Sequence, residues 1–416
     1  MNSASSPTQH VPANKPDPEQ VQQNKQQNKQ QRQALTAAST AHAVHDGLTD
    51  LIYVLLPIWQ SQFGISYAIA GLMRGIYAGC MASFQMQASK FSEHYGKKTL
   101  LVAGTALAGI AYLLAGQTTT LIGLIAALAL AGIGASTQHP LASSLVADAY
   151  DEDKSRSRSA LATYNFAGDI GKMALPAAVG LALSWWSWQQ SVTMVGIFGL
   201  ATAAWLAWVI QERRPTPSVH LPPTDATALP STQHYSKGFQ ALLATGVIDS
   251  ATRMGFLTFL PFVLKNKGAT TATIGLALSL LFVGGAAGKL VCGYLGRRIG
   301  MLKTVWITEI LTALVIFCIL YLPLTYALIT LPAIGLALNG TSSVLYGSVP
   351  ELVPIHHRSR AFALFYTGTI GGSALSPLFF GWLGDHTGIM LAMQCVALFV
   401  LLTLPLAWMV NKELSR

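Results

Sequence analysis

The chain has 416 residues, of which 52% are hydrophobic and only 10% are charged, and its mean hydropathy is +0.45. An average soluble domain carries roughly 25% charged residues, so this composition excludes a water-soluble enzyme and predicts a helical bundle in a membrane. The net charge of +9 arises from bases spread over short loops, with no single stripe that would predict a nucleic-acid partner.

Residues 1–33 are rich in Gln, Asn, Pro and Lys, which predicts a disordered cytoplasmic tail. The rest divides into apolar runs of about 20 residues, the length that crosses a bilayer as a helix. Continuous runs favour helices over a closed barrel, which would need alternating strands. Twelve spans are expected, at 38–61, 66–88, 99–117, 121–147, 159–183, 190–211, 239–264, 272–295, 304–322, 325–348, 360–383 and 389–411.

The distribution of bases predicts the topology. Of 26 Lys and Arg residues, 20 lie in the two termini and in the loops after even-numbered spans, and only Lys265 and Lys267 lie in the opposite loops. Because cytoplasmic loops are rich in Lys and Arg, both termini are expected in the cytoplasm. The chain is expected to lie in the inner membrane of a bacterial cell and to be a monomer. Segment 212–238 is expected to be a cytoplasmic linker between two six-helix halves, 34–211 and 239–416.

The two halves repeat in sequence. Four correspondences fall at offsets of 201 to 204 residues: Asp46 with Asp249, Gly96 with Gly300, Arg158 with Arg360, and Pro176 with Pro377. Parallel six-helix repeats are typical of transporters in which one half rocks against the other around a central site. The predicted fold class is therefore an all-α membrane protein of twelve helices in two pseudo-symmetric halves.

Ionisable side chains within the spans cost about 2.5–3.5 kcal/mol each on insertion scales and indicate function by default. His42, Asp46 and Asp50 are spaced i, i+4, i+8 and share one helix face, bordered by His45. Carboxylates beside histidines suit proton coupling, a role also assigned to His139 in the fourth span. The alternatives are a structural Asp46 bonded to backbone, a merely solvated His42, and a His139 that satisfies the carbonyl freed by the following proline.

The span expected at 239–264 carries Asp249 and Arg253 at i, i+4, and the span at 159–183 carries Asp169 and Lys172 at i, i+3. Either pair can be an internal ion pair or can bind an anionic substrate. Glu309 is expected to have a structural partner, either Lys289 or Lys303. The full set of predicted substrate-binding residues is Arg253, Lys172, Asp169, Asp249, Arg74, Gln138, Tyr164, Asn165, Asn339 and Tyr366.

Two loop motifs resemble those of the major facilitator superfamily. The first runs from Ser89 through Glu93 and His94 to Gly96 and Lys97, and the second from Gly293 through Arg297 to Gly300. The loops after the spans at 121–147 and 325–348, in which an acid is followed by bases, also resemble loops of that superfamily. The resemblance implies gating roles for Glu93, Gly96, Lys97, Asp148, Arg158, Lys289, Arg297, Glu351 and Arg360, and it implies the twelve-helix fold.

Within the superfamily, the chain is most similar to fosmidomycin-resistance-type exporters. Three segments carry this resemblance: His42-Ala-Val-His45-Asp46, Gln138-His139-Pro140, and the segment from Tyr164 to Pro176 in the span at 159–183. Asp169 stands where those exporters have asparagine, which favours a different substrate.

These features predict a proton-coupled secondary transporter for a small anionic or zwitterionic compound, exporting by proton antiport. The alternatives are proton-coupled uptake of an organic anion and a membrane sensor that transports nothing. The sequence has no catalytic, nucleotide-binding or zinc-ligand spacing, so no enzyme activity, metal site or cofactor is expected.

Overall fold

The structure, a computed structural model, describes residues 18–151, 153–210, 235–354 and 358–414. The regular structure in these ranges is entirely α-helical, which confirms the predicted all-α class. The helices are α1 (Pro18–Asp50), α2 (Ile52–Phe63), α3 (Tyr67–Tyr95), α4 (Lys97–Gln117), α5 (Leu121–Ala135), α6 (Gln138–Ala149), α7 (Lys154–Ala182), α8 (Trp188–Val209), α9 (Lys237–Asn266), α10 (Thr271–Ile299), α11 (Met301–Tyr321), α12 (Leu324–Leu352), α13 (Arg358–Thr387), α14 (Ile389–Val400) and α15 (Thr403–Leu414).

Over the described residues these fifteen helices form the twelve predicted spans, because three spans are each interrupted once. The breaks separate α1 from α2, α5 from α6, and α14 from α15. Pro140 and Pro405 explain two of them: each lies four residues after the break and has no N–H for the carbonyl of Ser136 or Leu401. Interrupted helices leave backbone groups free to line a site inside the bundle.

Eight segments of the described chain are long and apolar enough to cross a membrane by length and composition. The other four spans are α1–α2, α3, α7 and α13. Three of these contain intramembrane charges, namely Asp46, Arg74 and Lys172, which lower their mean hydropathy. Candidate functional groups also lie on the more apolar spans, for example Asp249 and Arg253 on α9 and His139 on α6.

The first span begins earlier than predicted. Helix α1 starts at Pro18, so residues 18–33 are helical although the sequence pattern predicted a disordered tail there. The reason is local: this stretch is dominated by Gln, which has good helix propensity, and contains neither Gly nor Pro after Pro18. Residues 1–17 and most of the predicted linker lie outside the described residues.

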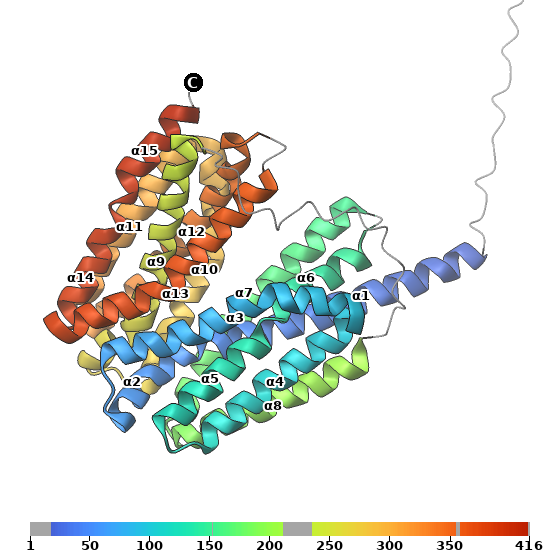
Figure 1. The fold of residues 1–416 in the computed structure, drawn as a ribbon, viewed down its shortest axis with the longest axis horizontal. Helices are drawn as coiled ribbons and strands as arrows, with labels where there is room; N and C mark the ends of the chain where they lie inside the picture. Colours follow the sequence, from blue (N-terminus) through green and yellow to red (C-terminus); the bar gives the residue numbers. More distant parts are fainter. Residues whose placement is uncertain (1–17, 152, 211–234, 355–357, 415–416) are drawn as a thin grey trace, which may run out of the picture.

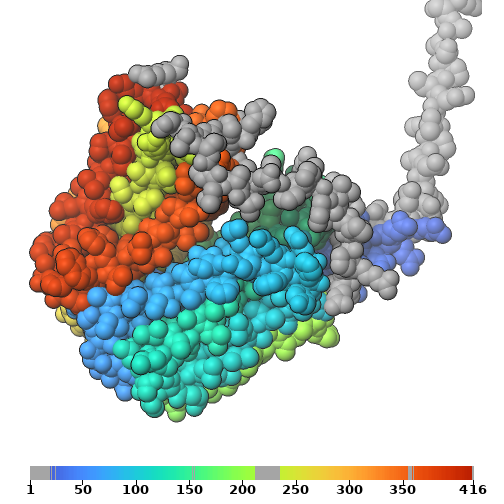
Figure 2. Space-filling model, viewed as in Figure 1, coloured from blue at the N-terminus to red at the C-terminus, as the bar shows by residue number. Residues whose placement is uncertain are grey.

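The two halves, α1–α8 and α9–α15, pack through α3 against α13 and α7 against α10. Figure 2 shows α3 and α13 side by side along the junction. Glycines allow this close approach: a Cβ on Gly71 would overlap the carbonyl of Pro377, and one on Gly275 would lie 2.6 Å from the carbonyl oxygen of Pro176. Small residues at such crossings are typical of packing between membrane helices.

The halves are joined by hydrogen bonds at the end of the bundle where α2 and α9 finish, here called the far end. The carboxylate of Asp385 on α13 accepts from the backbone amides of Tyr67 (2.7 Å) and Ala68 (3.0 Å) and so caps α3. The Lys265 ammonium on α9 donates to the Pro57 carbonyl (3.0 Å). Toward the opposite end, which carries the C-terminus, the halves diverge in a V (Figure 1).

Candidate functional site

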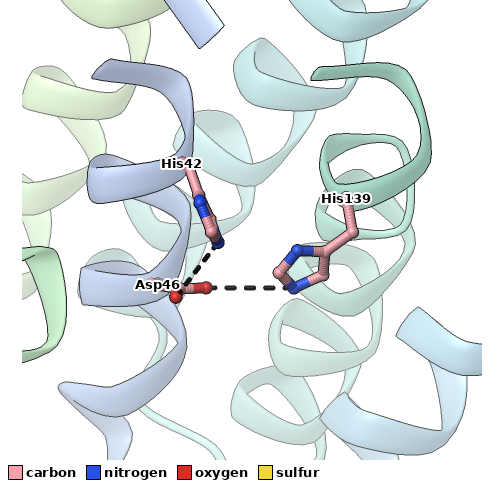
Figure 3. A group of neighbouring side chains, drawn as sticks. All are labelled: His42, Asp46 and His139. Atoms are coloured by element: carbon pink, nitrogen blue, oxygen red, sulfur yellow. Dashed lines mark ion pairs between the residues drawn. The ribbon is translucent and has the colours of Figure 1, made fainter. Parts of the chain in front are cut away.

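The charged groups of the N-terminal half converge on the carboxylate of Asp46. His42 Nε2 and Lys172 Nζ lie 3.3 Å from Oδ2, while His45 Nε2 and His139 Nε2 lie 3.7 and 3.9 Å from Oδ1. Figure 3 shows His42 and His139 directed at Asp46 from facing helices, α1 and α6. We call these five residues the Asp46 cluster. Asp46 is buried, whereas the side chains of Lys172 and His139 are 31% and 42% exposed.

Two glycines of α7 make room for the cluster. A Cβ on Gly168 would lie 2.6 Å from Asp46 Oδ2 and 2.7 Å from the His42 ring, and one on Gly171 would overlap the carbonyl oxygen of Ala43. Any larger residue would push α7 away from α1. The Gly-x-x-Gly spacing therefore sets the depth at which Lys172, one position later, reaches Asp46.

The backbone fixes the tautomer of His42. Its Nδ1 lies 2.9 Å from the carbonyl oxygen of Tyr164, which can only accept, so Nδ1 carries the hydrogen. Stacking of the His42 ring on the Tyr164 ring, with centroids 4.2 Å apart, holds this orientation. Nε2 then faces Asp46, and this contact is attractive only when a proton lies on Nε2 or on the carboxyl group. The geometry thus creates a position for one proton.

The same groups also meet the distance criterion for a metal. Ligand atoms of His42, Asp46 and His139 all lie within 4.8 Å of one another. A histidine oriented through Nδ1 by a carbonyl is common around metals. However, the Lys172 ammonium lies 3.3 Å from Asp46 Oδ2, the same oxygen that His42 contacts. Its positive charge would repel a divalent cation there. The residues fit a proton better than a metal ion.

A cavity of about 10 Å³ adjoins the cluster and is lined by His45, Gln138 and Tyr77, among others. His45 Nε2 and Gln138 Nε2 are buried and have no hydrogen-bond partner within the described part of the chain. A volume of this size holds about one water molecule, which could bridge the two groups. Tyr164 donates to Gln138 Oε1 over 3.4 Å, so Gln138 is tied to the cluster.

Asp50, one turn beyond Asp46, belongs to a different enclosed network. Its Oδ1 lies 4.0 Å from the Arg74 guanidinium, which stacks over Tyr53 and Tyr77 with centroid distances of 5.0 and 5.6 Å. Arg74 is 3% exposed, and Thr49 shares a 2.9 Å hydrogen bond with the Tyr77 hydroxyl. In this conformation the guanidinium is sealed from any substrate, although the sequence predicted that it binds one.

Helices α7 and α10 are linked by an ion pair across the two halves. Lys289 Nζ on α10 donates to both carboxylate oxygens of Asp169 on α7, over 2.6 and 2.8 Å. Lys289 was expected at the inner gate and Asp169 near Lys172. The structure instead pairs Asp169 with Lys289 and leaves Lys172 to Asp46, because positions three apart on α7 face different neighbours.

In the C-terminal half, the expected Asp249–Arg253 ion pair is not among those that the described residues form within 4.0 Å. Asp249 on α9 and Glu309 on α11 are each 1% exposed, and Asp249 Oδ2 and Glu309 Oε1 have no hydrogen-bond partner among the described residues. Lys289, which was expected to pair with Glu309, forms its ion pair with Asp169. Arg253 remains within electrostatic range of Asp50, Asp249 and Glu309.

The other predicted substrate-binding residues lie apart from the cluster. Asn165 is exposed, and Asn339 donates back to its own helix at Gly335. Tyr366 packs on Tyr346, with ring centroids 5.0 Å apart.

Among the predicted gating residues, Lys97 pairs with Asp148 over 2.5 Å within the N-terminal half, next to Gly96 at a positive φ of 83°. The other side chains of this set are at least partly exposed at the diverging end: Glu93, Arg158, Arg297, Glu351 and Arg360.

Sequence reasoning missed several groups that the site uses. Tyr53 and Tyr77 enclose Arg74, and Tyr112 donates to the Leu48 carbonyl. The i, i+3 spacing of Arg74 and Tyr77 was the one available signal, but it does not reveal which face of α3 meets α1.

Comparison with known families identifies the fold. The sequence matches the Major Facilitator Superfamily over residues 38–248 and 242–415. The chain belongs to the major facilitator superfamily. Solved structures agree: a bacterial homologue of the human lysosomal transporter Spinster, in an inward-facing and occupied conformation, superposes with a TM-score of 0.74 at 15% identity, covering 91% of this chain and 96% of that one. A mutant of the nucleoside transporter NupG gives a TM-score of 0.70 at 14% identity, covering 91% of this chain and 99% of that one.

Curated relatives are distant. An uncharacterized MFS-type transporter of Bacillus subtilis, YceJ, is 24% identical over 66% of this chain and 70% of its own length. A gallate transporter of Pseudomonas putida is 29% identical over 39% of this chain, and the multidrug resistance protein MdtL of Klebsiella pneumoniae is 28% identical over 42%. The matches span only 36% and 45% of the length of these last two relatives. The chain is therefore a multi-pass membrane transporter of this superfamily.

Proposed function

We propose that the chain is a proton-coupled secondary transporter that exports a small anionic or zwitterionic organic compound across the bacterial inner membrane by alternating access. The observation that carries the proposal is the Asp46 cluster, in which one buried carboxylate faces three imidazoles and an ammonium. A transporter needs such a group, because its charge must change when a proton binds and its partners must then be free to rearrange.

The exposed nitrogens of the cluster fit the substrate side of the proposal. Lys172 and His139 are partly solvent-accessible beside a buried Asp46. A carboxylate or phosphonate of the substrate can pair with Lys172 as a point charge, and Arg253, half-buried in the opposite half, offers a second cation. The names of two relatives, a gallate transporter and a multidrug resistance protein, are compatible with small organic cargo.

Antiport requires that substrate and proton compete. A zwitterionic substrate meets this requirement, because its cationic group can replace the proton at Asp46 while its anionic group contacts Lys172. The resemblance to fosmidomycin-resistance-type exporters supports this direction, as does the similarity to MdtL.

One contact favours a second candidate, proton-coupled uptake of an organic anion. Lys172 Nζ lies 3.3 Å from Asp46. A proton on Asp46 would release Lys172 to bind an anion, so proton and anion would bind together and move in the same direction. The charge of the substrate therefore decides between antiport and symport.

The membrane orientation follows from the positive-inside rule. With 20 of 26 bases on the side of the termini, that side is proposed to be cytoplasmic. The V formed by the two halves then opens toward the cytoplasm, and the far end, closed by Asp385 and Lys265, faces the periplasm. Lys97–Asp148 and the neighbouring loop charges are proposed to form the cytoplasmic gate.

A substrate screen in proteoliposomes tests the proposal. Radiolabelled carboxylates, phosphonates and amino-acid-like zwitterions are offered to vesicles with an acidic or an alkaline lumen. We expect a zwitterion to accumulate in acidic-lumen vesicles, in exchange for protons that leave. Accumulation in alkaline-lumen vesicles would replace antiport by symport. Accumulation that ignores the pH gradient in both preparations would contradict proton coupling.

A further inference from the structure

The first helix extends well beyond the bilayer span predicted for it. Helix α1 begins at Pro18, and Figure 1 shows its first turns projecting past the other helices of the N-terminal half. This projection carries three bases, Lys25, Lys29 and Arg32, and a single acid, Glu19. The proposed transport cycle uses none of these residues, so their positive charge needs a separate explanation.

The three bases form one continuous stripe. Their spacing is i, i+4, i+7, which on a helix of 3.6 residues per turn places them within about 60° of one another. All three side chains are exposed, and none forms an ion pair within 4.0 Å among the described residues. We call Lys25, Lys29 and Arg32 the α1 stripe. Its positive charge is available to a partner outside the bundle.

A hydrogen-bonded contact with α7 sets the depth of this stretch. Arg156 Nη2 donates to Asn28 Oδ1 over 3.0 Å and to Gln31 Oε1 over 2.9 Å. Arg156 lies three residues before the span predicted at 159–183, about 4.5 Å from it along the helix axis. The headgroups extend roughly 5–7 Å beyond the hydrocarbon core on each side of a bilayer. The contact therefore holds the α1 stripe beside the headgroups instead of in bulk solution.

Two acids near the start of α7 have partners of their own. Asp153 Oδ1 accepts from the backbone amides of Ser155 (2.9 Å) and Arg156 (3.0 Å), and so caps that helix. Asp148, at the end of α6, pairs with Lys97. These carboxylates are committed to contacts away from the α1 stripe.

We propose that the α1 stripe binds the anionic headgroups of phospholipids in the adjacent leaflet, which is the cytoplasmic one in the orientation proposed above. Phosphate oxygens at this depth match ammonium and guanidinium groups that form no ion pair in the described chain. A base near an anionic membrane surface contributes roughly a fivefold preference for it. Lipid binding holds α1, the helix that carries Asp46, at a fixed depth in the bilayer.

Electron spin resonance of spin-labelled lipids tests this surface on the full-length chain without substrate. The chain is reconstituted into phosphatidylcholine vesicles that contain a trace of spin-labelled phosphatidylglycerol or phosphatidylcholine. The motionally restricted fraction of each label measures the lipid held by the protein. We expect wild-type protein to prefer phosphatidylglycerol, and this preference to fall when added salt screens the charges. Equal restricted fractions of the two lipids in wild-type protein would overturn the proposal.

Removal of the stripe tests where the lipid binds. The triple variant Lys25→Gln/Lys29→Gln/Arg32→Gln keeps good helix formers at all three positions and leaves Asn28 and Gln31 in place. It should lose the preference for phosphatidylglycerol, roughly fivefold for each base. Far-UV circular dichroism checks that the helix is retained, and Lys29→Gln alone gives the single step if the triple variant does not fold. Full retention of the preference in these variants would refute the assignment.

A matched control separates the stripe from net charge. The variant Lys90→Gln/Arg298→Gln/Lys303→Gln also removes three exposed bases from the same side of the membrane, but from the ends of α3, α10 and α11. It should keep the wild-type preference. Equal loss in both triple variants would overturn the proposal, because the preference would then come from total charge. Failure of proton coupling would leave this result untouched, since the spectra need neither substrate nor a pH gradient.

Discussion

The two halves place an acid at the same repeat position but surround it differently. Asp46 faces nitrogen: three imidazoles and an ammonium, two of them reaching solvent. Asp249 is 1% exposed, its Oδ2 has no hydrogen-bond partner, and it forms no ion pair within 4.0 Å among the described residues. The first arrangement stabilises a carboxylate and can exchange partners with a substrate, while the second buries a carboxyl group without a close cation. The duplicated scaffold thus surrounds its two repeat-related acids differently, because the neighbouring helices differ.

Substitution of Asp46 removes the acid from the nitrogen-rich site of the N-terminal half. Asp46→Asn removes the charge that holds Lys172 and His42, so gradient-driven accumulation of substrate should be abolished. Exchange of labelled for unlabelled substrate without a gradient should be weakened but retained, since it needs no net proton movement and Lys172 still contacts the anionic group of the substrate. Both are measured in the same proteoliposomes. Full gradient-driven accumulation by the variant would assign the coupling proton to another group.

Arg74 tests how strongly the N-terminal half depends on enclosed charge. Arg74→Gln leaves Asp50 buried without its cation, and breaking a buried pair costs about 3–5 kcal/mol. The expected result is a lower melting temperature in detergent, with partial rescue by Asp50→Asn in the same chain. A melting temperature equal to that of wild type would show that Asp50 is already neutral.

Gly171 tests the packing that positions Lys172. Gly171→Ala places a methyl group against the Ala43 carbonyl, and overpacking of this kind costs about 1–3 kcal/mol. We expect reduced thermal stability together with reduced transport. Gly79→Ala is a suitable control, because a Cβ there meets no atom within 4 Å. Equal behaviour of the two variants would mean that α1 and α7 separate readily.

Lys289 tests how strongly one ion pair holds the two halves together at their junction. Its ion pair with Asp169 is partly exposed, with Lys289 44% accessible, so Lys289→Gln should weaken the junction by only about 1 kcal/mol. The balance between open and closed conformations would then shift roughly fivefold, since 1.4 kcal/mol corresponds to a factor of ten. Spin-label distances across the V measure this shift. The charge-swapped double variant Asp169→Lys/Lys289→Asp should restore the wild-type distribution, and a persistent shift would refute the pairing.

The fold was largely predictable because its signals are local. Apolar length, base distribution and the constant offset of the repeat each depend on nearby residues, and they predicted the twelve spans. The start of α1 was missed because propensity for helix in a polar stretch, 18–33, is weaker than compositional evidence for disorder.

The site was only partly predictable because partner choice depends on helix rotation. Spacing correctly grouped His42, Asp46 and Asp50 on one helix. It could not show that Lys172 reaches Asp46 while Asp169 reaches Lys289, since this depends on the closeness of α1 and α7 at Gly171. Likewise, Asp249 and Arg253 have ideal i, i+4 spacing, yet they form no ion pair within 4.0 Å among the described residues.

We propose that substrate movement and proton movement are obligately linked through the Asp46 cluster. A direct measurement of this linkage starts from a substrate gradient and no pH gradient, with a pH-sensitive dye inside proteoliposomes of the wild-type protein. For export by antiport, entry of substrate should make the lumen more alkaline, because each entry is balanced by departure of protons. Movement of substrate with no change in lumenal pH would contradict the account.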